Sequence, residues 1–262
     1  MAKSSHANGA DSPTFAALEP AGADPVDIAA RYEADLRVRA DGGSWLVMNM
    51  IASVDGAIAI DGVSGGLGGA PDRQVFSALR GLADAILVAA GTARAEGYGP
   101  PRMSERAGER RWARGQAPTP LVALVTRSLD LDPTTSLFVD AERRPVIYTT
   151  ERSDPERRDA LSDVADVIDA GDAQVDLAEV VRDLGDRDCR VVLGEGGPSL
   201  NAQLFADDLV DELCLSLSPL VVGGAGGRIL RGAELPFRAH MSLDRVLCAD
   251  DFLFLRYLRG PR

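Results

Sequence analysis

The stretch Arg190-Val-Val-Leu-Gly-Glu-Gly-Gly-Pro-Ser-Leu200 decides the fold of this 262-residue chain. It reads as an apolar strand that runs into two glycines and then opens a helix at Pro198 and Ser199. Such a turn points backbone N–H groups out of the helix N-terminus, where they and the helix dipole favour an anion. Gly196 and Gly197 carry no Cβ, so a phosphate can approach the backbone. An ordinary turn between a strand and a helix accounts for the two glycines equally well.

A second segment of this kind lies far upstream. Residues 46–53 form an apolar strand that ends before a turn at Asp55, and a glycine-rich loop follows at 61–69. A helix is expected next, with core-facing residues at helical spacing: Val75, Phe76, Leu79 and Leu82.

Strands and helices alternate through the body of the chain, which indicates parallel strands joined by crossover helices. Strands are expected at 46–53, 85–90, 120–126, 145–149, 165–168 and 190–194, and helices at 72–82, 155–162, 176–184 and 198–206. The C-terminal part departs from this alternation: 211–222 reads as a long strand interrupted at Pro219, and 241–247 with 252–258 reads as a hairpin turning at Asp250-Asp251. The sequence therefore predicts an α/β fold with a mostly parallel sheet flanked by helices and antiparallel C-terminal strands.

The ends and loops of this fold are less regular. Residues 1–40 are rich in Ala, Asp, Gly, Ser and Pro and are expected to be a disordered tail, with a short helix at 25–37 as the alternative. Residues 41–262 are expected to form one domain. The Arg-rich stretch 100–118 is expected to be a mobile loop beside the site.

Composition excludes several function classes. Forty acidic against 28 basic residues give a net charge of -12, which argues against a nucleic-acid or anionic-membrane binder. No apolar run approaches the roughly 18 residues of a membrane span, and no apolar signal region follows Lys3. The scattered cysteines, in apolar stretches, are expected to be buried thiols in a reducing cytoplasm: Cys189, Cys214 and Cys248. No metal-ligand cluster is expected.

Five motifs in order identify a resemblance. They are 52–56 (Ala-Ser-Val-Asp-Gly), 83–85 (Ala-Asp-Ala), 91–96 (Gly-Thr-Ala-Arg-Ala-Glu), 196–200 (Gly-Gly-Pro-Ser-Leu) and 209–212 (Leu-Val-Asp-Glu). Across residues 45–258 they resemble the reductase domain of riboflavin biosynthesis, which reduces a ribosylaminopyrimidine phosphate with NADPH. The resemblance implies a dihydrofolate-reductase-like fold and a 5-amino-6-(5-phosphoribosylamino)uracil reductase type of activity.

The resemblance also implies where NADPH binds. Ala52 matches a position that touches the nicotinamide, and Gly91 with Thr92 lies near the phosphates. The helix start at 197–200 (Gly197, Pro198, Ser199 and Leu200), with Gly196 before it, would hold the pyrophosphate. The corner Thr126, Arg127 and Ser128 resembles a 2′-phosphate site, since Arg suits bidentate phosphate contact. A solvated loop arginine is the alternative reading of Arg127.

Two carboxylates are candidate catalytic residues on the same basis. Hydride transfer to the opened ribose also needs a proton for the ribose oxygen or nitrogen. Glu195 matches a substrate-contact position, and Glu96 matches an acidic position beside the cofactor. Further substrate-binding candidates are Asn49, Asp55, Ser64, Arg94 and Arg102. For Asp55, a plain turn role is the favoured alternative.

The sequence departs from the family at two places. Asn49 stands where deaminase-fused relatives carry Lys, and Gly66 stands where an aromatic residue is usual. Asn49 is expected to loosen discrimination between the deaminated and undeaminated pyrimidines, or else to tie down the turn near Asp55. Two alternative functions stay open: a dihydrofolate-reductase-type or other pterin or pyrimidine reductase, and a non-catalytic nucleotide-binding protein. A homodimer is expected through the apolar stretch 213–222 and the C-terminal hairpin.

Overall fold

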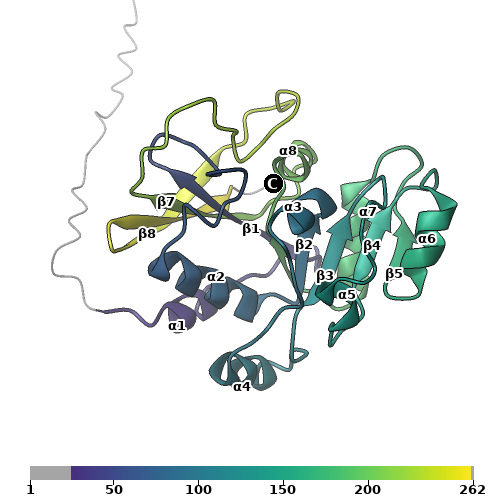
Figure 1. The fold of residues 1–262 in the computed structure, drawn as a ribbon. Coiled ribbons are helices and arrows are strands. Elements are labelled where there is room, and N and C mark those ends of the chain that lie inside the picture. The colour runs from purple at the N-terminus through teal and green to yellow at the C-terminus, as the bar shows by residue number, and fades with distance from the viewer. Residues whose placement is uncertain (1–24, 261–262) are drawn as a thin grey trace, which may run out of the picture.

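One nine-stranded sheet forms the centre of the computed structural model, which describes residues 25–260. Its strands are β1 (Trp45–Ser53), β2 (Ala85–Ala89), β3 (Leu121–Val125), β4 (Val146–Thr149), β5 (Asp166–Asp169), β6 (Val191–Gly194), β7 (Glu212–Ser218), β8 (Met241–Ala249) and β9 (Phe252–Arg259). They lie in the order β5-β4-β3-β2-β6-β1-β7-β9-β8 (Figure 1). Strands β1 to β7 pair in parallel, whereas β9 is antiparallel to both β7 and β8. The predicted fold class is confirmed.

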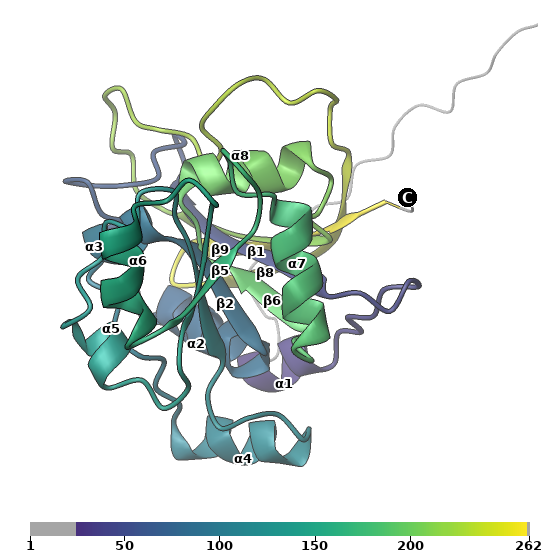
Figure 2. The same ribbon diagram turned by 90° about the vertical axis from the view of Figure 1, so that its right-hand side faces the viewer.

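Helices cover both faces of the sheet. They are α1 (Ile28–Glu33), α2 (Ala70–Leu82), α3 (Ala90–Ala95), α4 (Glu105–Ala113), α5 (Ser136–Val139), α6 (Pro155–Ser162), α7 (Leu177–Asp186) and α8 (Pro198–Ala206). Figure 2 shows α7 and α8 on one side of the strands and α3, α5 and α6 on the other. Helix α2 packs against the sheet through Val75, Leu79 and Leu82, which are buried beside Val47 of β1. These contacts fix the position of α2 over the end of β1.

Phe76 differs from this pattern. The sequence predicted it as a core residue, but its ring is only half-buried and faces a cleft. A helix repeats every 3.6 residues, so position 76 falls on the margin of the apolar stripe that Val75 and Leu79 define.

Residues 25–40 pack against the domain, in contrast to the expected tail, whose residues 1–24 lie outside the described residues. Tyr32 on α1 is 1% exposed, and Arg37 forms a bidentate pair with the buried Glu212 at 3.0 and 2.8 Å. Arg39 donates to Asp211 at 3.0 Å. Local sequence did not reveal these contacts, because Arg37 and Arg39 pair with carboxylates more than 170 residues away.

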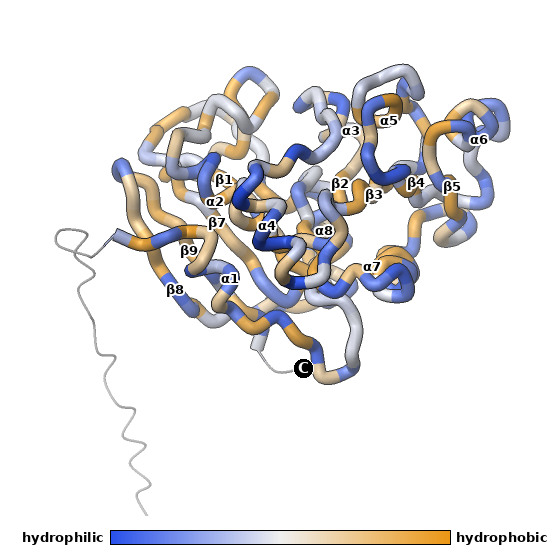
Figure 3. The backbone as a smooth tube through the Cα atoms, turned by 90° about the horizontal axis from the view of Figure 1, so that it is seen from below, coloured by the Kyte–Doolittle hydropathy of each residue, from blue (hydrophilic) through white to orange (hydrophobic). Residues whose placement is uncertain are grey.

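The stretch 100–118, predicted as a mobile loop, contains α4. Ser104 caps this helix by accepting a hydrogen bond from the N–H of Ala107. The helix is hydrophilic along most of its length (Figure 3), which explains why apolar periodicity did not reveal it. Arg111 anchors it: the guanidinium is fully buried and donates to the carbonyl oxygens of Ala83 and Ala117 at 2.6 and 2.8 Å.

Strand β7 is shorter than predicted, and it is an interior strand. It ends at Ser218, because Pro219 has no N–H to donate to a neighbouring strand. Its neighbours are β1 on one side and β9 on the other. The hairpin of β8 and β9 turns at Asp250-Asp251 as predicted. The expectation that all three cysteines are buried is wrong for Cys248, which is exposed on β8, while Cys189 and Cys214 are buried.

Candidate functional site

A cleft of about 610 Å³ opens at the C-terminal ends of β1, β2 and β6. These strands meet where the chain order of the sheet reverses, and ligands bind at this place in open α/β sheets. The start of α8, the helices α2 and α3, and the loops at 58–68 and near 229 complete its walls. Nine predicted site residues line the cleft: Asn49, Ser64, Gly91, Thr92, Glu96, Glu195, Gly196, Gly197 and Pro198.

A turn with the backbone features of an anion site, called the cradle below, lies where β6 enters α8. Gly197 is the N-cap of the helix and provides no side-chain cap, so the first-turn N–H groups are free of a side-chain acceptor. A Cβ at residue 197 would lie 2.5 Å from Oγ1 of Thr92, so only glycine fits there. Gly196 has φ of +100°, a conformation that favours glycine, and a cis peptide bond joins it to Gly197. With no side chain at 196 or 197, and with Thr92 packed directly against it, the backbone of the helix start borders the cleft, where a phosphate can approach it.

Asn201 fastens a loop over the same end of the cleft. Its side chain is 1% exposed and donates from Nδ2 to the carbonyl oxygen of Ile229 at 2.8 Å. The N–H of Arg231 donates to the carbonyl oxygen of Pro198 at 2.9 Å. The stretch around 229 therefore closes the cleft beside the cradle.

Glu195 is held in the cleft by two partners. Arg80 of α2 makes a bidentate pair with its carboxylate, with both distances 2.7 Å, and the hydroxyl of Tyr98 donates to Oε2 at 2.7 Å. The side chain is 2% exposed. Burial and the neighbouring carboxylate raise the pKa of Tyr98, which keeps its hydroxyl a donor. The charge of Glu195 is therefore fixed in place beside Gly196.

Helix α2 presents a second set of polar and aromatic groups to the cleft. Asp72, Phe76 and Arg80 follow one another at intervals of four residues, so they share one face of the helix, and all three line the cleft. The guanidinium carbon of Arg80 lies 4.3 Å from the ring centroid of Phe76 and 5.4 Å from that of Tyr98. The Arg80 side chain thus joins the aromatic wall to the carboxylate of Glu195.

Glu96, the second candidate catalytic carboxylate, is the C-cap residue of α3. Its Oε1 accepts a hydrogen bond from the N–H of Ser64 at 2.8 Å, which ties the glycine-rich loop to the cleft wall. Asn49 lies on β1, two residues before Ile51, so both side chains face α2. Gly66 packs against Ile60, where a Cβ would lie 3.1 Å from the Cβ of Ile60. A side chain at this position would press on Ile60, and the aromatic rings that line this cleft are those of Phe76 and Tyr98.

Several predicted residues lie outside the lining of the cleft: Ala52, Asp55, Arg94, Arg102, Thr126, Arg127, Ser128, Ser199 and Leu200. Asp55 accepts hydrogen bonds from the hydroxyl of Ser53 at 2.5 Å and from the N–H of Gly223 at 2.7 Å. These bonds lower the pKa of Asp55 to about 2 and match the turn role. Arg94 pairs with Asp130, and Arg102 is exposed.

The corner after β3 is a separate surface. Thr126 is buried and its hydroxyl accepts from the N–H of Leu129 at 3.1 Å, whereas Arg127 and Ser128 are exposed. Leu200 lies in the first turn of α8, with its side chain buried in the hydrophobic core. Thr126 and Leu200 are therefore buried behind the cleft, whereas Arg127 and Ser128 lie on the surface beyond it.

The lining of the cleft also includes residues that were not predicted as site residues, among them Asp72, Phe76, Arg80, Tyr98 and Asn201. The spacing of Asp72, Phe76 and Arg80 was a usable signal, because a carboxylate, an aromatic ring and a guanidinium at intervals of four share one helix face. Tyr98 and Asn201 had no such signal, since their roles depend on Glu195 and on a distant loop.

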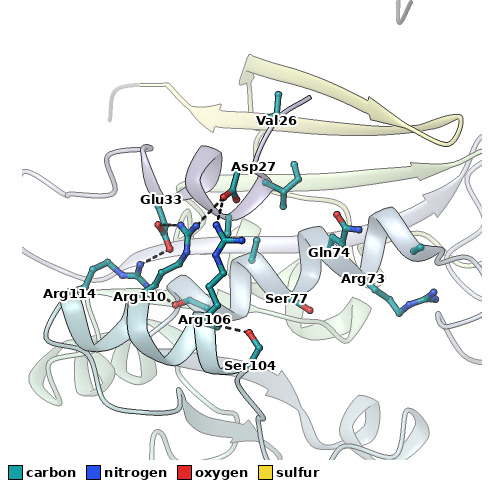
Figure 4. Close-up of a pocket in the computed structure, with 16 residues that line it drawn as sticks. Val26, Asp27, Glu33, Arg73, Gln74, Ser77, Ser104, Arg106, Arg110 and Arg114 are labelled. Atoms are coloured by element: carbon teal, nitrogen blue, oxygen red, sulfur yellow. Dashed lines mark hydrogen bonds and ion pairs between the residues drawn. The ribbon is translucent and has the colours of Figure 1, made fainter. Parts of the chain in front are cut away.

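A second cavity, of about 690 Å³, lies between α1, α2 and α4. Figure 4 shows the guanidinium groups of Arg106, Arg110 and Arg114 pointing from α4 toward Asp27 and Glu33. The basic groups are thus engaged in ion pairs that hold α1 to α4. This groove joins two helices, and the cleft at the strand ends is the candidate site.

Within residues 25–260, no group of three or more His, Cys, Asp and Glu side chains has the arrangement of a metal site. No helix in that part of the chain has the length and apolarity to cross a membrane.

Comparisons with known proteins agree with this geometry. Residues 44–249 match the RibD C-terminal domain. The 2,5-diamino-6-ribosylamino-4(3H)-pyrimidinone 5′-phosphate reductase of Methanothermobacter thermautotrophicus is 30% identical over 190 residues, which cover 72% of this chain and 84% of the relative. The reductase of the same name from Archaeoglobus fulgidus is 28% identical over 184 residues, covering 69% and 82%. A pyrimidine reductase-like protein from Corynebacterium diphtheriae superposes with a TM-score of 0.81 at 26% identity, covering 90% of this chain and 100% of that one. The chain is therefore a member of the RibD C-terminal domain family.

Proposed function

We propose that this protein is an NADPH-dependent reductase of a ribosylaminopyrimidine 5′-phosphate in riboflavin biosynthesis. The observation that carries the proposal is one cleft that joins the anion cradle of α8 to the fixed carboxylate of Glu195. Family membership and the names of the relatives from Methanothermobacter thermautotrophicus and Archaeoglobus fulgidus support the same chemistry.

The cradle fits a dinucleotide phosphate. Residue 197 has space for no side chain, and the uncapped N-terminus of α8 faces the open cleft beside Thr92. The residues from Gly196 to Leu200 would hold the pyrophosphate, and Gly91 and Thr92 would flank it. Arg127 and Ser128, exposed after β3, would receive the 2′-phosphate. A nicotinamide held there supplies a hydride.

The protein's own groups orient the substrate and manage the proton. Glu195 accepts from Arg80 and Tyr98, so its carboxylate stays in one position beside the reacting carbon. Glu96 is half-buried in the cleft, where it is the candidate to deliver the proton directly or through a water. The loop at 229, fastened by Asn201, limits access of bulk water at the cradle end.

A cofactor-oxidation assay tests the proposal. Purified protein is mixed with NADPH and, in separate reactions, the deaminated phosphoribosylaminopyrimidine, its undeaminated analogue and dihydrofolate. Oxidation with either pyrimidine supports the proposal. Oxidation with dihydrofolate alone would assign a dihydrofolate-reductase-type activity instead. NADPH binding without oxidation in any reaction would leave a non-catalytic nucleotide-binding protein.

We further propose that the protein is a homodimer working in the cytoplasm. Exposed apolar side chains cluster where β1 and β7 end: Val54 is 59% exposed and Val221 is 78% exposed, with Leu220 and Val222 beside them. Free Cys189 and Cys214 suit a reducing compartment. Light scattering at micromolar concentration should give twice the mass of the chain, and Val221→Asp should shift it toward one chain. A monomeric mass for the unaltered protein would contradict the dimer.

A further inference from the structure

The wall of the cleft formed by α2 carries a carboxylate with no assigned role. Asp72 lies one turn from Phe76 and two turns from Arg80, about 12 Å along the helix. Glu195 is engaged by Arg80 and Tyr98, and Glu96 by the N–H of Ser64. Within residues 25–260, Asp72 makes no ion pair within 4 Å, although the charge of Arg73 is near enough to act on it. Its carboxylate lines the cleft and has Ser216 as a side-chain hydrogen-bond partner, which leaves acceptor capacity for a ligand.

The surroundings of Asp72 hold its carboxylate in one place. The hydroxyl of Ser216, buried on β7, hydrogen-bonds to it, and Ser216 pairs in register with Ile51 of β1, another lining residue. On the other side, a Cβ at Gly68 would lie 2.9 Å from Oδ2 of Asp72. Position 68 therefore suits a glycine for as long as the carboxylate stays where it is. Burial raises the pKa of Asp72, partly offset by Ser216 and by the charge of Arg73.

We propose that Asp72 reads the amino edge of the pyrimidine, and that it selects a 2-amino-4-oxo ring over the corresponding uracil. The proposal rests on the proposed function and names the substrate class of the same cleft. A 2-amino-4-oxo ring presents a ring N–H and an amino group side by side, two donors that match the two oxygens of a carboxylate. A uracil presents a carbonyl oxygen in place of the amino group, and this oxygen would face the negative charge.

Phe76 completes the recognition. It lies one turn beyond Asp72 on the same helix face, and Arg80 covers its ring with the guanidinium carbon 4.3 Å from the centroid. A flat heterocycle that pairs with Asp72 lies within reach of this aromatic wall. Asn49 on the opposite wall both donates and accepts hydrogen bonds, so it gives no preference of its own between the two rings. Discrimination is therefore left to Asp72.

The test compares the unaltered protein with Asp72→Asn, which keeps the shape of the side chain but adds a donor and removes the charge. We expect kcat/KM for the 2-amino pyrimidine to fall at least tenfold and that for the uracil to change less than about threefold. Gly68→Ala, which presses a methyl group against Oδ2, should shift the ratio in the same direction with the charge retained. Asp159→Asn, an exposed carboxylate on α6, is the matched control and should leave both values unchanged.

Calorimetric binding of each pyrimidine to the cofactor-free protein separates this proposal from the proposed function. A loss of affinity confined to the 2-amino compound in Asp72→Asn supports the role of Asp72, even if neither pyrimidine is reduced. An equal loss for both rings, or no loss, would overturn it. Melting temperatures of all three variants identify any general damage to the fold. If Asp72→Asn is unstable, the binding of the two pyrimidines by Gly68→Ala decides the role of Asp72 instead.

Discussion

Glu195 shows how a single residue in the cleft depends on others far away in sequence. Its two oxygens accept three hydrogen bonds, from Arg80 and Tyr98, and it is followed directly by the glycines of the cradle. A carboxylate so fully engaged has little freedom to move, which suits orientation of a substrate. Arg80 gains a fixed position from the same pair.

Glu195→Gln removes the charge and keeps the shape. We expect unchanged NADPH affinity, because the cradle lies on the backbone, and a kcat/KM for the pyrimidine reduced about tenfold or more. Fluorescence titration of the cofactor and steady-state kinetics measure the two quantities. Glu142→Gln, exposed at the opposite edge of the sheet, is the control. An unchanged kcat/KM in Glu195→Gln would remove this residue from the site.

Arg127 tests the choice of cofactor. If its guanidinium pairs with the 2′-phosphate, Arg127→Ala should weaken NADPH binding by roughly 1.5–3 kcal/mol and leave NADH binding nearly unchanged. Titration of both cofactors decides the matter, and Arg152→Ala, another exposed arginine, serves as control. Equal losses for the two cofactors would mean that Arg127 makes no contact with the 2′-phosphate.

Residues could be predicted where their role follows from local sequence. Gly196 and Gly197 were predicted as site residues, because a strand, two glycines and a helix start within ten residues indicate an anion site, and both glycines line the cleft. Arg80 and Tyr98 were missed, because their role exists only once α2 and the end of α3 meet Glu195 in space. Arg94, predicted to contact substrate, instead pairs with Asp130, a partner that no local pattern indicates.

At the scale of elements, α8 carries the cradle and α2 carries the opposite wall. Their positions follow from the apolar stripes that the sequence displays, so both helices were predicted. Helix α4 was not, because a buried arginine rather than an apolar face anchors it. Arg111 donates to carbonyl oxygens at the C-terminal end of α2, where a cation is favoured by the helix dipole.

Gly197→Ala tests the cradle as an element. The added Cβ would lie 2.5 Å from Oγ1 of Thr92, so either the helix start or Thr92 must shift. We expect NADPH binding to weaken at least tenfold while the melting temperature changes by only a few degrees, a split that titration and thermal unfolding record. Gly108→Ala adds a methyl group in α4 with no atom within 4 Å and should bind NADPH normally. Normal binding by Gly197→Ala would place the cofactor phosphates elsewhere.

At the scale of the whole molecule, an ion network joins the first described residues to the last strands. Glu212 on β7 accepts from Arg37, Arg256 and the indole of Trp45, and Asp35 pairs with Arg245 on β8. Residues 25–40 thereby become part of the fold. The sheet order was predictable in outline from alternating elements, but this network was not, because it pairs residues as distant in sequence as Asp35 and Arg245, which are 210 residues apart.

The network gives stability a defined pH dependence. Burial alone would raise the pKa of Glu212, but hydrogen bonds and charges from Arg256 and Arg37 outweigh it and hold the pKa at about 2, below its usual value of 4.5. Because the folded pKa is lower, this contribution is complete above about pH 4.5 and is lost as pH falls toward 2. It amounts to about 3 kcal/mol.

Glu212→Gln should therefore lower the free energy of unfolding at pH 7 by about 3–5 kcal/mol, since it removes the buried carboxylate that Arg37 and Arg256 share and leaves them only Asp35 and Asp244 as counter-charges. The loss should shrink as pH falls from 4.5 toward 2. Denaturant unfolding at several pH values measures it, with Asp166→Asn, an exposed carboxylate on β5, as control. A loss that stays constant with pH would contradict the ionic account.

The pairing of Asp35 with Arg245 also constrains the order in which the chain folds during its synthesis. A ribosome makes the chain from the N-terminus, so Asp35 has no Arg245 to pair with until β8 is made, when synthesis is almost complete. During that interval β7 has only β1 beside it, and its free side offers unpaired backbone groups to other nascent chains. A truncated mRNA that ends before the codon for Phe252 would yield a polypeptide in which this side of β7 stays unpaired. Such products should aggregate, whereas the full-length chain should stay in solution.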